Sequence, residues 1–373
     1  MRFVVNRRRD SCLSGLSSLR TYHVFVIFAL LLFGYFWFVR YAANLIPSVP
    51  FKTPFKGFLI IDSNCLERVK DYRSCESSKI QIADFSDTKL VNKVHISKGV
   101  DDPTKDYFIF ITKGAKRAVR KFEPVRHELP GFDYSPVFIP SNISGFLWEL
   151  ERAQFVDCLG IDMHRSMWSN RQISLSFIEH IAAMRDLLIN YGITPILFGG
   201  TVLGWFRECS VISHTKDVDF GILATEYNPN LLESLKVSTQ FELYWTLGQL
   251  TNNFEISVYA QNTKIDLFLL YPLNDSISIY TGGFDLDSQQ KILYVYPNIK
   301  TICSGDLFGR LVFVPCNSVQ IIEADHGRDW LTDVSSSSYV WYKTPKSIYN
   351  VTKMSKEETS KVTTCYAVDG CDR

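Results

Sequence analysis

The stretch that decides the fold lies near the middle of the chain. It reads Ile196-Leu-Phe-Gly-Gly-Thr-Val-Leu-Gly-Trp-Phe-Arg207 and, after a short loop, Lys216-Asp-Val-Asp-Phe-Gly-Ile222. Its first three apolar residues predict a short strand, Gly199-Gly200 a turn, and Thr201 the cap of a short helix. The second run predicts another strand, from Asp217 to Ile222. Helices and strands that alternate in this way are typical of an α/β fold with a mixed sheet.

Two acidic residues on this second predicted strand are expected to share one face. Asp217 and Asp219 are two positions apart, so their side chains project together from backbone positions about 6.5–7 Å apart. Asp266 lies in a further predicted strand, Ile265–Tyr271, among apolar neighbours. An ionised carboxylate is costly there unless it is paired or bound to a metal. We therefore predict that all three acids hold one or two Mg²⁺ or Mn²⁺ ions, which prefer oxygen ligands.

The glycine turn before the short helix is suited to an anionic ligand. Gly199 and Gly200 allow a close approach of the backbone, and a helix that starts there presents free N–H groups to phosphate. Thr201 belongs to the same turn. Arg207 and Lys216 are the nearby cations that we expect to contact phosphate. For Arg207 the sequence leaves a second interpretation open, a simple ion pair with Glu208.

The rest of the chain predicts two parts after residue 56. Residues 57–170 carry two short apolar runs, 58–61 and 107–112, which are expected to be buried strands of a small α/β accessory domain. Residues 171–373 carry the motifs above and form the predicted catalytic domain. Its first helix is indicated by apolar residues at helical spacing, with Gly192 at its end, and its later strands are expected at 241–247, 254–259 and 265–271.

The N-terminal part predicts a membrane anchor. Residues 21–39 contain no Asp, Glu, Lys or Arg, and as a helix they would rise about 28 Å, close to the hydrocarbon thickness of a bilayer. Five arginines precede this run and only Arg40 and Lys52 closely follow it, so the positive-inside rule predicts a cytoplasmic tail (1–20), a single-pass type II anchor (21–39), a stem (40–56) and a lumenal remainder. The alternative is a cleaved signal peptide, whose apolar region is shorter, about 7–15 residues.

The cysteines and glycosylation acceptors agree with a lumenal location, and the balance of charge argues against a protein that coats nucleic acid. The chain has 373 residues, with 40 Lys and Arg against 39 Asp and Glu, so nothing suggests a protein that coats nucleic acid. None of the nine cysteines forms a CxxC pair, so their spacing gives no support to a zinc site, and eight of them would face an oxidising lumen. Cys65–Cys75 and Cys365–Cys371 are plausible local disulfides, while the remaining pairing stays open. Glycosylation acceptors occur at Asn142, Asn274 and Asn350.

Several runs of the chain together resemble the fukutin-like branch of the LicD group, which includes bacterial phosphocholine transferases. The resemblance lies in Leu197–Arg207, Ile212–Ile222, Lys264–Phe268, Val314–Cys316 and Ile322–Trp330. It implies a nucleotidyltransferase-like catalytic domain in which Asp217, Asp219 and Asp266 bind the metal. It also implies that Gly200 and Thr201 contact the donor phosphates.

The resemblance further implies a function. Fukutin-like proteins transfer ribitol 5-phosphate from CDP-ribitol to a sugar hydroxyl of an O-mannosyl glycan on a glycoprotein. This chain is therefore expected to be a metal-dependent transferase of the Golgi membrane, with the endoplasmic reticulum as the alternative compartment, and to work beside other Golgi glycosyltransferases. Two other interpretations stay open at this point. One is a nucleotidyltransferase that acts at the α-phosphate, and the other is a catalytically silent lumenal partner of a glycosyltransferase.

Overall fold

A computed structural model describes residues 54–71, 73–75, 80–86, 95–129, 137–165, 172–275, 277–335, 337–367 and 370–371. The chain from residue 49 onward falls into one compact unit. The predicted tail, the predicted anchor and nearly all of the predicted stem lie outside the described residues. Within the described ranges, no helix combines the length and the apolar character needed to cross a bilayer.

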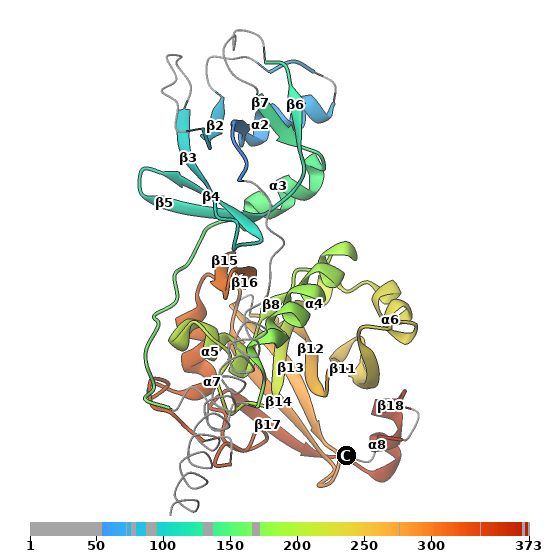
Figure 1. Cartoon of the computed structure of the whole chain (residues 1–373). Helices are drawn as coiled ribbons and strands as arrows, with labels where there is room; N and C mark the ends of the chain where they lie inside the picture. The colour runs from blue at the N-terminus through green and yellow to red at the C-terminus, as the bar shows by residue number, and fades with distance from the viewer. Residues whose placement is uncertain are drawn as a thin grey trace, which may run out of the picture. The chain divides into compact units, whose positions relative to one another are not determined.

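The first part of the described chain forms a seven-stranded mixed sheet (Figure 1). The strands are ordered β5-β4-β3-β2-β1-β7-β6, and two helices, α2 and α3, accompany them. Their bounds are β1 Phe58–Ile60, α2 Ser63–Lys70, β2 Gln81–Asp84, β3 His95–Asp101, β4 Tyr107–Thr112, β5 Ala115–Arg120, β6 Pro124–His127, β7 Val137–Pro140 and α3 Ile143–Glu151. A disulfide between Cys65 and Cys75 closes the loop after α2.

The second part is built on an eleven-stranded mixed sheet whose main path is β15-β16-β8-β9-β12-β11-β10-β18. The strands are β8 Ile196–Leu197, β9 Asp217–Leu223, β10 Glu242–Gln249, β11 Asn252–Ala260, β12 Thr263–Pro272, β13 Ser278–Asp285, β14 Gln290–Pro297, β15 Ile302–Leu307, β16 Arg310–Pro315, β17 Ile348–Lys353 and β18 Thr363–Cys365. The helices are α4 Ile178–Asn190, α5 Gly199–Glu208, α6 Pro229–Lys236, α7 Ser318–His326 and α8 Lys356–Val362.

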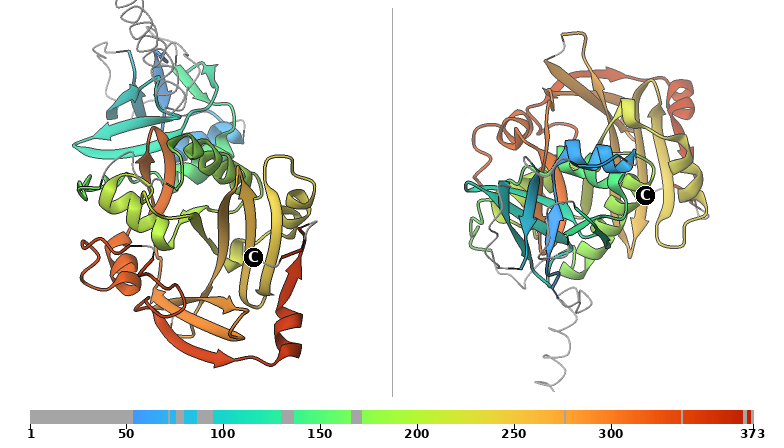
Figure 2. Two further views of the ribbon diagram at one scale, coloured as in Figure 1. Left: turned by 60° about the horizontal axis from the view of Figure 1, so that its bottom comes forward. Right: turned by 90° about the horizontal axis from the view of Figure 1, so that it is seen from above.

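Three strands leave this main path as a separate ribbon. β13 pairs with the end of β12 and with β14, and β14 pairs with β17. Figure 2 shows the ribbon in orange and red at the bottom of its left view, below the long strands β10, β11 and β12. The ribbon therefore adds a second layer beside the end of β12.

The two sheets are joined by polar and apolar contacts. The Tyr107 hydroxyl donates to Asp306 at 2.8 Å, and the buried Arg185 guanidinium pairs with Asp106 at 2.9 Å. Leu311 and Phe313 of β16 belong to the same buried apolar cluster as Tyr107. A buried arginine that lost its partner would be strongly destabilising, so these contacts tie the two sheets together.

Most predicted elements agree with the structure within two residues at each end, including the strands at 58–61, 107–112, 217–222 and 265–271. The mixed α/β fold is confirmed. The predicted first catalytic helix begins later than its pattern indicates, at Ile178, after a 3₁₀ turn. Gly192 adopts a φ of 75° just beyond its end, which a glycine does without steric cost. The domain boundary at residue 170 stays a prediction.

Candidate metal centre

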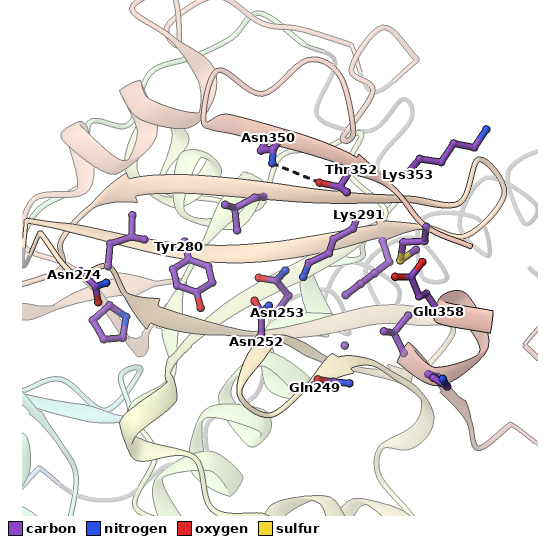
Figure 3. A pocket seen from close by; sticks show the side chains of 18 residues that line it. Gln249, Asn252, Asn253, Asn274, Tyr280, Lys291, Asn350, Thr352, Lys353 and Glu358 are labelled. Atoms are coloured by element: carbon purple, nitrogen blue, oxygen red, sulfur yellow. Dashed lines mark hydrogen bonds between the residues drawn. The ribbon is translucent and has the colours of Figure 1, made fainter. Parts of the chain in front are cut away.

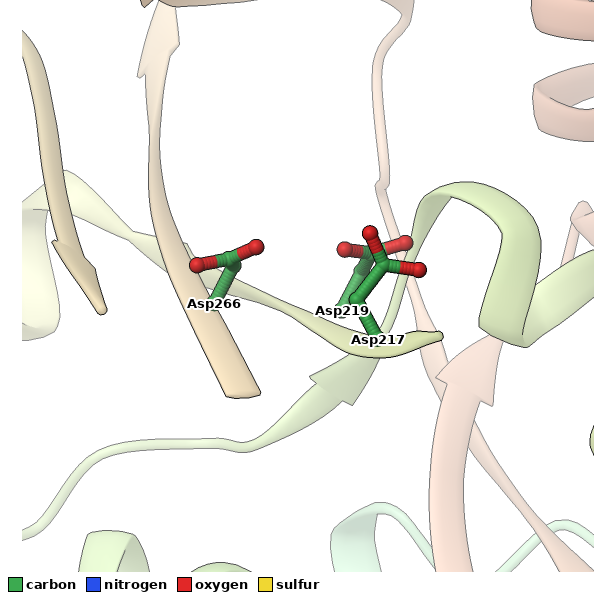
Figure 4. Close-up of side chains that lie close together, drawn as sticks. All are labelled: Asp217, Asp219 and Asp266. Atoms are coloured by element: carbon green, nitrogen blue, oxygen red, sulfur yellow. The ribbon is translucent and has the colours of Figure 1, made fainter. Parts of the chain in front are cut away.

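Three acidic side chains from two neighbouring strands meet at one point. β9 and β12 are parallel, and their register places Asp219 opposite Asp266 and Asp217 opposite Lys264. One carboxylate oxygen from each of Asp217, Asp219 and Asp266 lies within 4.8 Å of the others. Figure 4 shows Asp217 and Asp219 projecting together from one strand toward the side on which Asp266 projects from the next. The structure therefore brings together the three acids that strand alternation singled out.

Like charges dominate the electrostatics of this cluster. Burial raises the pKa of Asp219 well above its usual value, and the carboxylates of Asp217 and Asp266 raise it further. Burial also raises the pKa of Asp266, and Lys264 opposes that increase. Among the described residues, no hydrogen bond reaches the Asp219 carboxylate, whereas Asp217 accepts one from Thr215 at 2.8 Å. Asp219 is therefore the acid with the least compensation from the protein.

This donor set fits a hard divalent cation. It offers only carboxylate oxygens, which Mg²⁺ and Mn²⁺ prefer, and such ions complete their shell with water and substrate phosphate. The backbone at Gly199 lies directly against the cluster, and a β carbon at this position would be only 2.7 Å from Asp219 Oδ2. Gly199 has a φ of 51°, so both its conformation and the close carboxylate favour glycine at this position. Asp217, Asp219 and Asp266 would hold the ion.

The start of α5 lies against this cluster. The helix begins at Gly199 with Phe198 as its N-cap and has no side-chain cap, so the prediction that Thr201 caps it was wrong. The Thr201 hydroxyl instead accepts a hydrogen bond from the backbone N–H of Asp219 at 2.8 Å. Thr201 thus fixes the strand that carries the acids, while Gly199 and Gly200 open the helix beside them. A helix N-terminus in this position favours an anionic ligand.

The two predicted phosphate-binding cations lie in different surroundings. Arg207 is buried at the far end of α5, where its guanidinium donates to Glu208 at 2.6 Å and to the Trp330 carbonyl at 2.8 Å. This location does not support the predicted phosphate contact and agrees with the alternative of an ion pair with Glu208. Lys216 is exposed directly before β9 and makes no ion pair with any described residue. Its predicted contact with phosphate stays a prediction.

The sequence interpretation missed the polar residues that surround Asp266. The Ser257 hydroxyl donates to Asp266 at 2.5 Å, and the Trp245 indole N–H donates to Ser257 at 2.6 Å. Lys264 Nζ lies 3.0 Å from the other carboxylate oxygen of Asp266. Burial raises the pKa of Glu255 to about 7, and the nearby Asp266 charge adds to the increase. Strand alternation could have identified Lys264, which is two positions before Asp266.

Lys264 carries the positive charge that stabilises this part of the site. Burial opposes its charge, but the Asp266 and Glu255 carboxylates more than offset that effect, so its pKa lies above the usual value. Lys264 Nζ also lies 5.5 Å from the centre of the Trp245 ring, a distance typical of a cation–π contact. The ammonium group therefore stays charged beside the acids across the physiological pH range.

Another acid beyond the start of α5 is fully partnered. Asp325, in α7, accepts hydrogen bonds from Tyr296 at 3.0 Å and from Ser347 at 2.7 Å. It lies too far from the cluster to belong to the group of acids that could share an ion. Its satisfied, buried carboxylate is typical of an internal structural network.

Comparisons with known proteins identify the family of the domain that contains this cluster. A family model described as LicD/FKTN/FKRP, nucleotidyltransferase domain, matches residues 192–317, a range that contains all three acids. The uncharacterized protein T07A5.1 of Caenorhabditis elegans is 31% identical and covers 83% of this chain and 84% of its own length.

Relatives with a named activity are more distant. The ribitol-5-phosphate transferase FKTN is 26% identical in Mus musculus and 25% identical in Homo sapiens, with 57% of this chain matched in each case. The match spans 47% of those transferases, or about half their length. The family match, the extent of the nematode similarity and the likeness to fukutin agree, and this chain belongs to the fukutin-like LicD family.

Proposed function

We propose that this protein transfers a phospho-alditol, ribitol 5-phosphate, from a CDP-linked donor to a sugar hydroxyl of a glycoprotein O-mannosyl glycan. The observation that carries the proposal is the cluster of Asp217, Asp219 and Asp266 within 4.8 Å beside the glycine start of α5. Membership of a family that includes ribitol-5-phosphate transferases supports the choice of reaction. The predicted type II anchor and Golgi location belong to the same proposal, because acceptor glycans of this kind are lumenal.

The proposed reaction is a single displacement at phosphorus. The acceptor oxygen forms a bond to the phosphorus that carries the alditol, the bond from that phosphorus to the CMP oxygen breaks, and CMP leaves. The hydroxyl proton moves to a carboxylate, for which Asp219 and Asp266 are the candidates. A divalent ion, when bound, would neutralise phosphate charge and align the two oxygens.

The chain's own residues would position the substrates. The free N–H groups at the start of α5 would hold donor phosphate, and exposed Lys216 would add a positive charge at the entrance. Lys264 and Ser257 would fix the orientation of the Asp266 carboxylate through their contacts at 3.0 and 2.5 Å. Positioning of this kind accounts for most of the catalysis in phosphoryl transfer.

The direct test is a donor panel. The purified protein would be incubated with CDP-ribitol, other CDP-polyols and CDP-choline, with Mg²⁺ or Mn²⁺ and an O-mannosyl glycopeptide acceptor. We expect CMP release with one CDP-polyol and a matching mass increase of the acceptor. Release of pyrophosphate would instead support attack at the α-phosphate, and the absence of any turnover would support a silent partner.

Variants of the acids make the test specific. Asp217→Asn and Asp266→Asn should each lower transfer by at least 100-fold while the protein stays folded, because each removes one metal-binding charge. Asp287→Asn is the matched control, since Asp287 is exposed and lies in the β13–β14 turn. Turnover of the donor by the Asp217→Asn protein at the wild-type rate would disprove the assignment.

A further inference from the structure

One row of paired residues runs across the second sheet and ends at the acids. The register pairs Cys365 of β18 with Trp245 of β10, Trp245 with Ser257 of β11, Ser257 with Asp266 of β12, and Asp266 with Asp219 of β9. Side chains that are opposite one another in such a row project from the same face of a sheet. Asp219 and Asp266 therefore share one face with Trp245 and Ser257.

A β-bulge in β10 brings Trp245 into this row. Leu243 lies opposite Val258. Two residues later, Trp245 lies opposite Ser257, which is only one position from Val258 in β11. Tyr244 is therefore an extra residue in β10. Without it, regular pairing would turn the Trp245 side chain to the other face of the sheet. Bulges beside functional sites commonly redirect a side chain in this way.

The indole group of Trp245 holds the hydroxyl group of Ser257. The indole N–H donates to Ser257 Oγ at 2.6 Å, and this nitrogen can only donate. The Ser257 oxygen must therefore accept that bond, which leaves its single proton for one of two carboxylates. Asp266 Oδ1 lies 2.5 Å away, whereas Glu255 Oε1 lies 3.1 Å away. The shorter contact assigns the proton to Asp266.

The same indole ring contacts the cation that pairs with Asp266. Lys264 Nζ lies 5.5 Å from the centre of the Trp245 ring, within the range of a cation–π contact, and 3.0 Å from Asp266 Oδ2. Ser257 thus holds one oxygen of the Asp266 carboxylate and Lys264 holds the other. Trp245 contacts both of these groups.

The polar contact of Trp245 is made within this row. At its far end β10 borders a polar groove (Figure 3), which Gly248 and Gln249 help to line, but no member of the row is among the lining residues of the groove. The indole N–H is the only polar group of the side chain, and it is bound to Ser257. Trp245 is therefore directed toward the acids and not toward the groove.

We propose that Trp245 is a positioning residue of the metal centre, which acts through Ser257 and Lys264 to hold the Asp266 carboxylate in the orientation that binds a divalent ion. The inference deepens the proposed function and rests on its metal centre, but it does not depend on the identity of the donor or the acceptor. Trp245→Phe would keep a ring beside Lys264 while freeing the Ser257 hydroxyl to turn toward Glu255. Loss of such a partner of a ligating carboxylate typically costs about 10–100-fold in metal affinity.

The test is a double-mutant cycle on metal affinity. Mn²⁺ binding to the full-length protein would be measured by calorimetry for wild type, Trp245→Phe, Ser257→Ala and the protein with both changes. We expect each single change to weaken binding by about tenfold. The double variant should bind at most about twofold more weakly than Ser257→Ala, because residues that act through one another are not additive. Additive losses, or unchanged affinity in Trp245→Phe, would overturn the proposal.

A matched control separates positioning from packing. Trp148 of α3 is also half-buried and also has a cation over its ring, Arg152 at 4.1 Å, but its indole N–H makes no hydrogen bond with any residue that the structure describes. Trp148→Phe should leave Mn²⁺ affinity at the wild-type value. A Trp245→Phe protein that loses only melting temperature in EDTA, with wild-type Mn²⁺ affinity, would show a packing role and contradict the proposal.

The proposal stays falsifiable if Trp245→Phe does not fold. Because Trp245 acts on the carboxylate through Ser257, a Ser257→Ala protein with wild-type Mn²⁺ affinity would contradict it. The outcome is also separate from that of the donor panel. A protein that follows the expected cycle but transfers no alditol would refute the proposed reaction and support the role of Trp245, whereas transfer with additive losses would do the reverse. A wild type that binds no divalent ion would overturn both.

Discussion

Replacing Asp219 by Asn should stabilise the metal-free protein and abolish its stabilisation by metal. The Asp219 carboxylate lies within 4.8 Å of two others, and its pKa is raised first by burial and then by those charges. Asparagine has nearly the same shape and carries no charge. The change therefore removes repulsion while the hydrogen bond from the Asp219 backbone N–H to Thr201 can remain.

The size of the effect follows from Coulomb's law. Two unit charges 4.8 Å apart interact by about 3.5 kcal/mol at an effective dielectric constant of 20. Lys264 is also close to the cluster and offsets part of the repulsion. We expect a net gain of about 1–3 kcal/mol in the free energy of unfolding at pH 8, worked from the same relation.

The pH dependence of this gain has a definite sign. A carboxyl whose folded pKa is raised destabilises the folded state when it is ionised, so the penalty is present above the folded pKa. It disappears as the pH falls toward the usual Asp value of 3.8, where the carboxyl is protonated in both states. The difference between the variant and the wild type should therefore shrink steadily from pH 8 to pH 4.

The assay is denaturant unfolding with EDTA and with saturating Mg²⁺ or Mn²⁺. Wild type should gain about 2.7 kcal/mol at an ion concentration of 100 times its dissociation constant, and the Asp219→Asn protein should gain almost nothing. Asp287→Asn, an exposed control, should behave like wild type. If Asp219→Asn lost stability in EDTA, or if no divalent ion stabilised the wild type, the electrostatic reasoning would be refuted.

Three further predictions concern neighbouring groups. Glu255→Gln should raise stability above pH 7 by at most about 3 kcal/mol and have little effect near pH 4.5, because the raised pKa of about 7 means that the ionised form destabilises the fold; urea unfolding at both pH values measures it. Lys264→Met should lower stability at pH 7 by about 3–5 kcal/mol, because it leaves the buried Asp266 carboxylate without its cation; equal melting temperatures for variant and wild type would contradict this. Replacing both residues of the Cys158–Cys209 disulfide, which are 51 positions apart, should cost about 4 kcal/mol on the chain-entropy model, a loss that chemical denaturation would detect.

The acids could be predicted from the sequence because one rule of strand geometry places them. Alternation puts Asp217 and Asp219 on one face, and an apolar strand around Asp266 indicates an interior position that needs a partner. Their meeting depends only on the pairing of β9 with β12, which the order of predicted elements allows. The relative arrangement of polar neighbours such as Ser257 depends on the register of β11 against β12, and one sequence contains no direct signal for that register.

Helix geometry explains why Arg207 pairs with Glu208, the alternative that the sequence left open. Arg207 lies eight positions after Gly199, and at 1.5 Å per residue this difference is about 12 Å along α5. Arg207 therefore lies at the C-terminal end of the helix, where a cation favours the carbonyl end of the dipole. Arg207 holds Glu208 and the backbone of Trp330 in place.

The first sheet was only partly predictable. β1 is wholly buried and half of the β4 residues are buried, and both strands are apolar runs in the sequence. By contrast, three of seven residues are exposed in β3, three of six in β5 and two of four in β6. Strands with many exposed residues lack the alternation of apolar and polar residues from which a strand is predicted in a sequence. The disulfides show the same limit. The local pairs of cysteines were plausible from spacing, whereas Cys303–Cys316 depends on the β15–β16 register.

The balance of charge around β12 argues that the site is kept for function rather than for stability. Directly opposed like charges on neighbouring strands are destabilising, yet Asp219 and Asp266 occupy opposed positions in the register. Glu255 adds a fourth carboxylate, and Lys264 supplies the ammonium group that faces them. Because Lys264 contacts Asp266 directly, it fixes that acid and leaves Asp219 with the weakest compensation. The fold therefore holds a local excess of negative charge beside a helix N-terminus, an arrangement that a bound divalent cation and a phosphate would together stabilise.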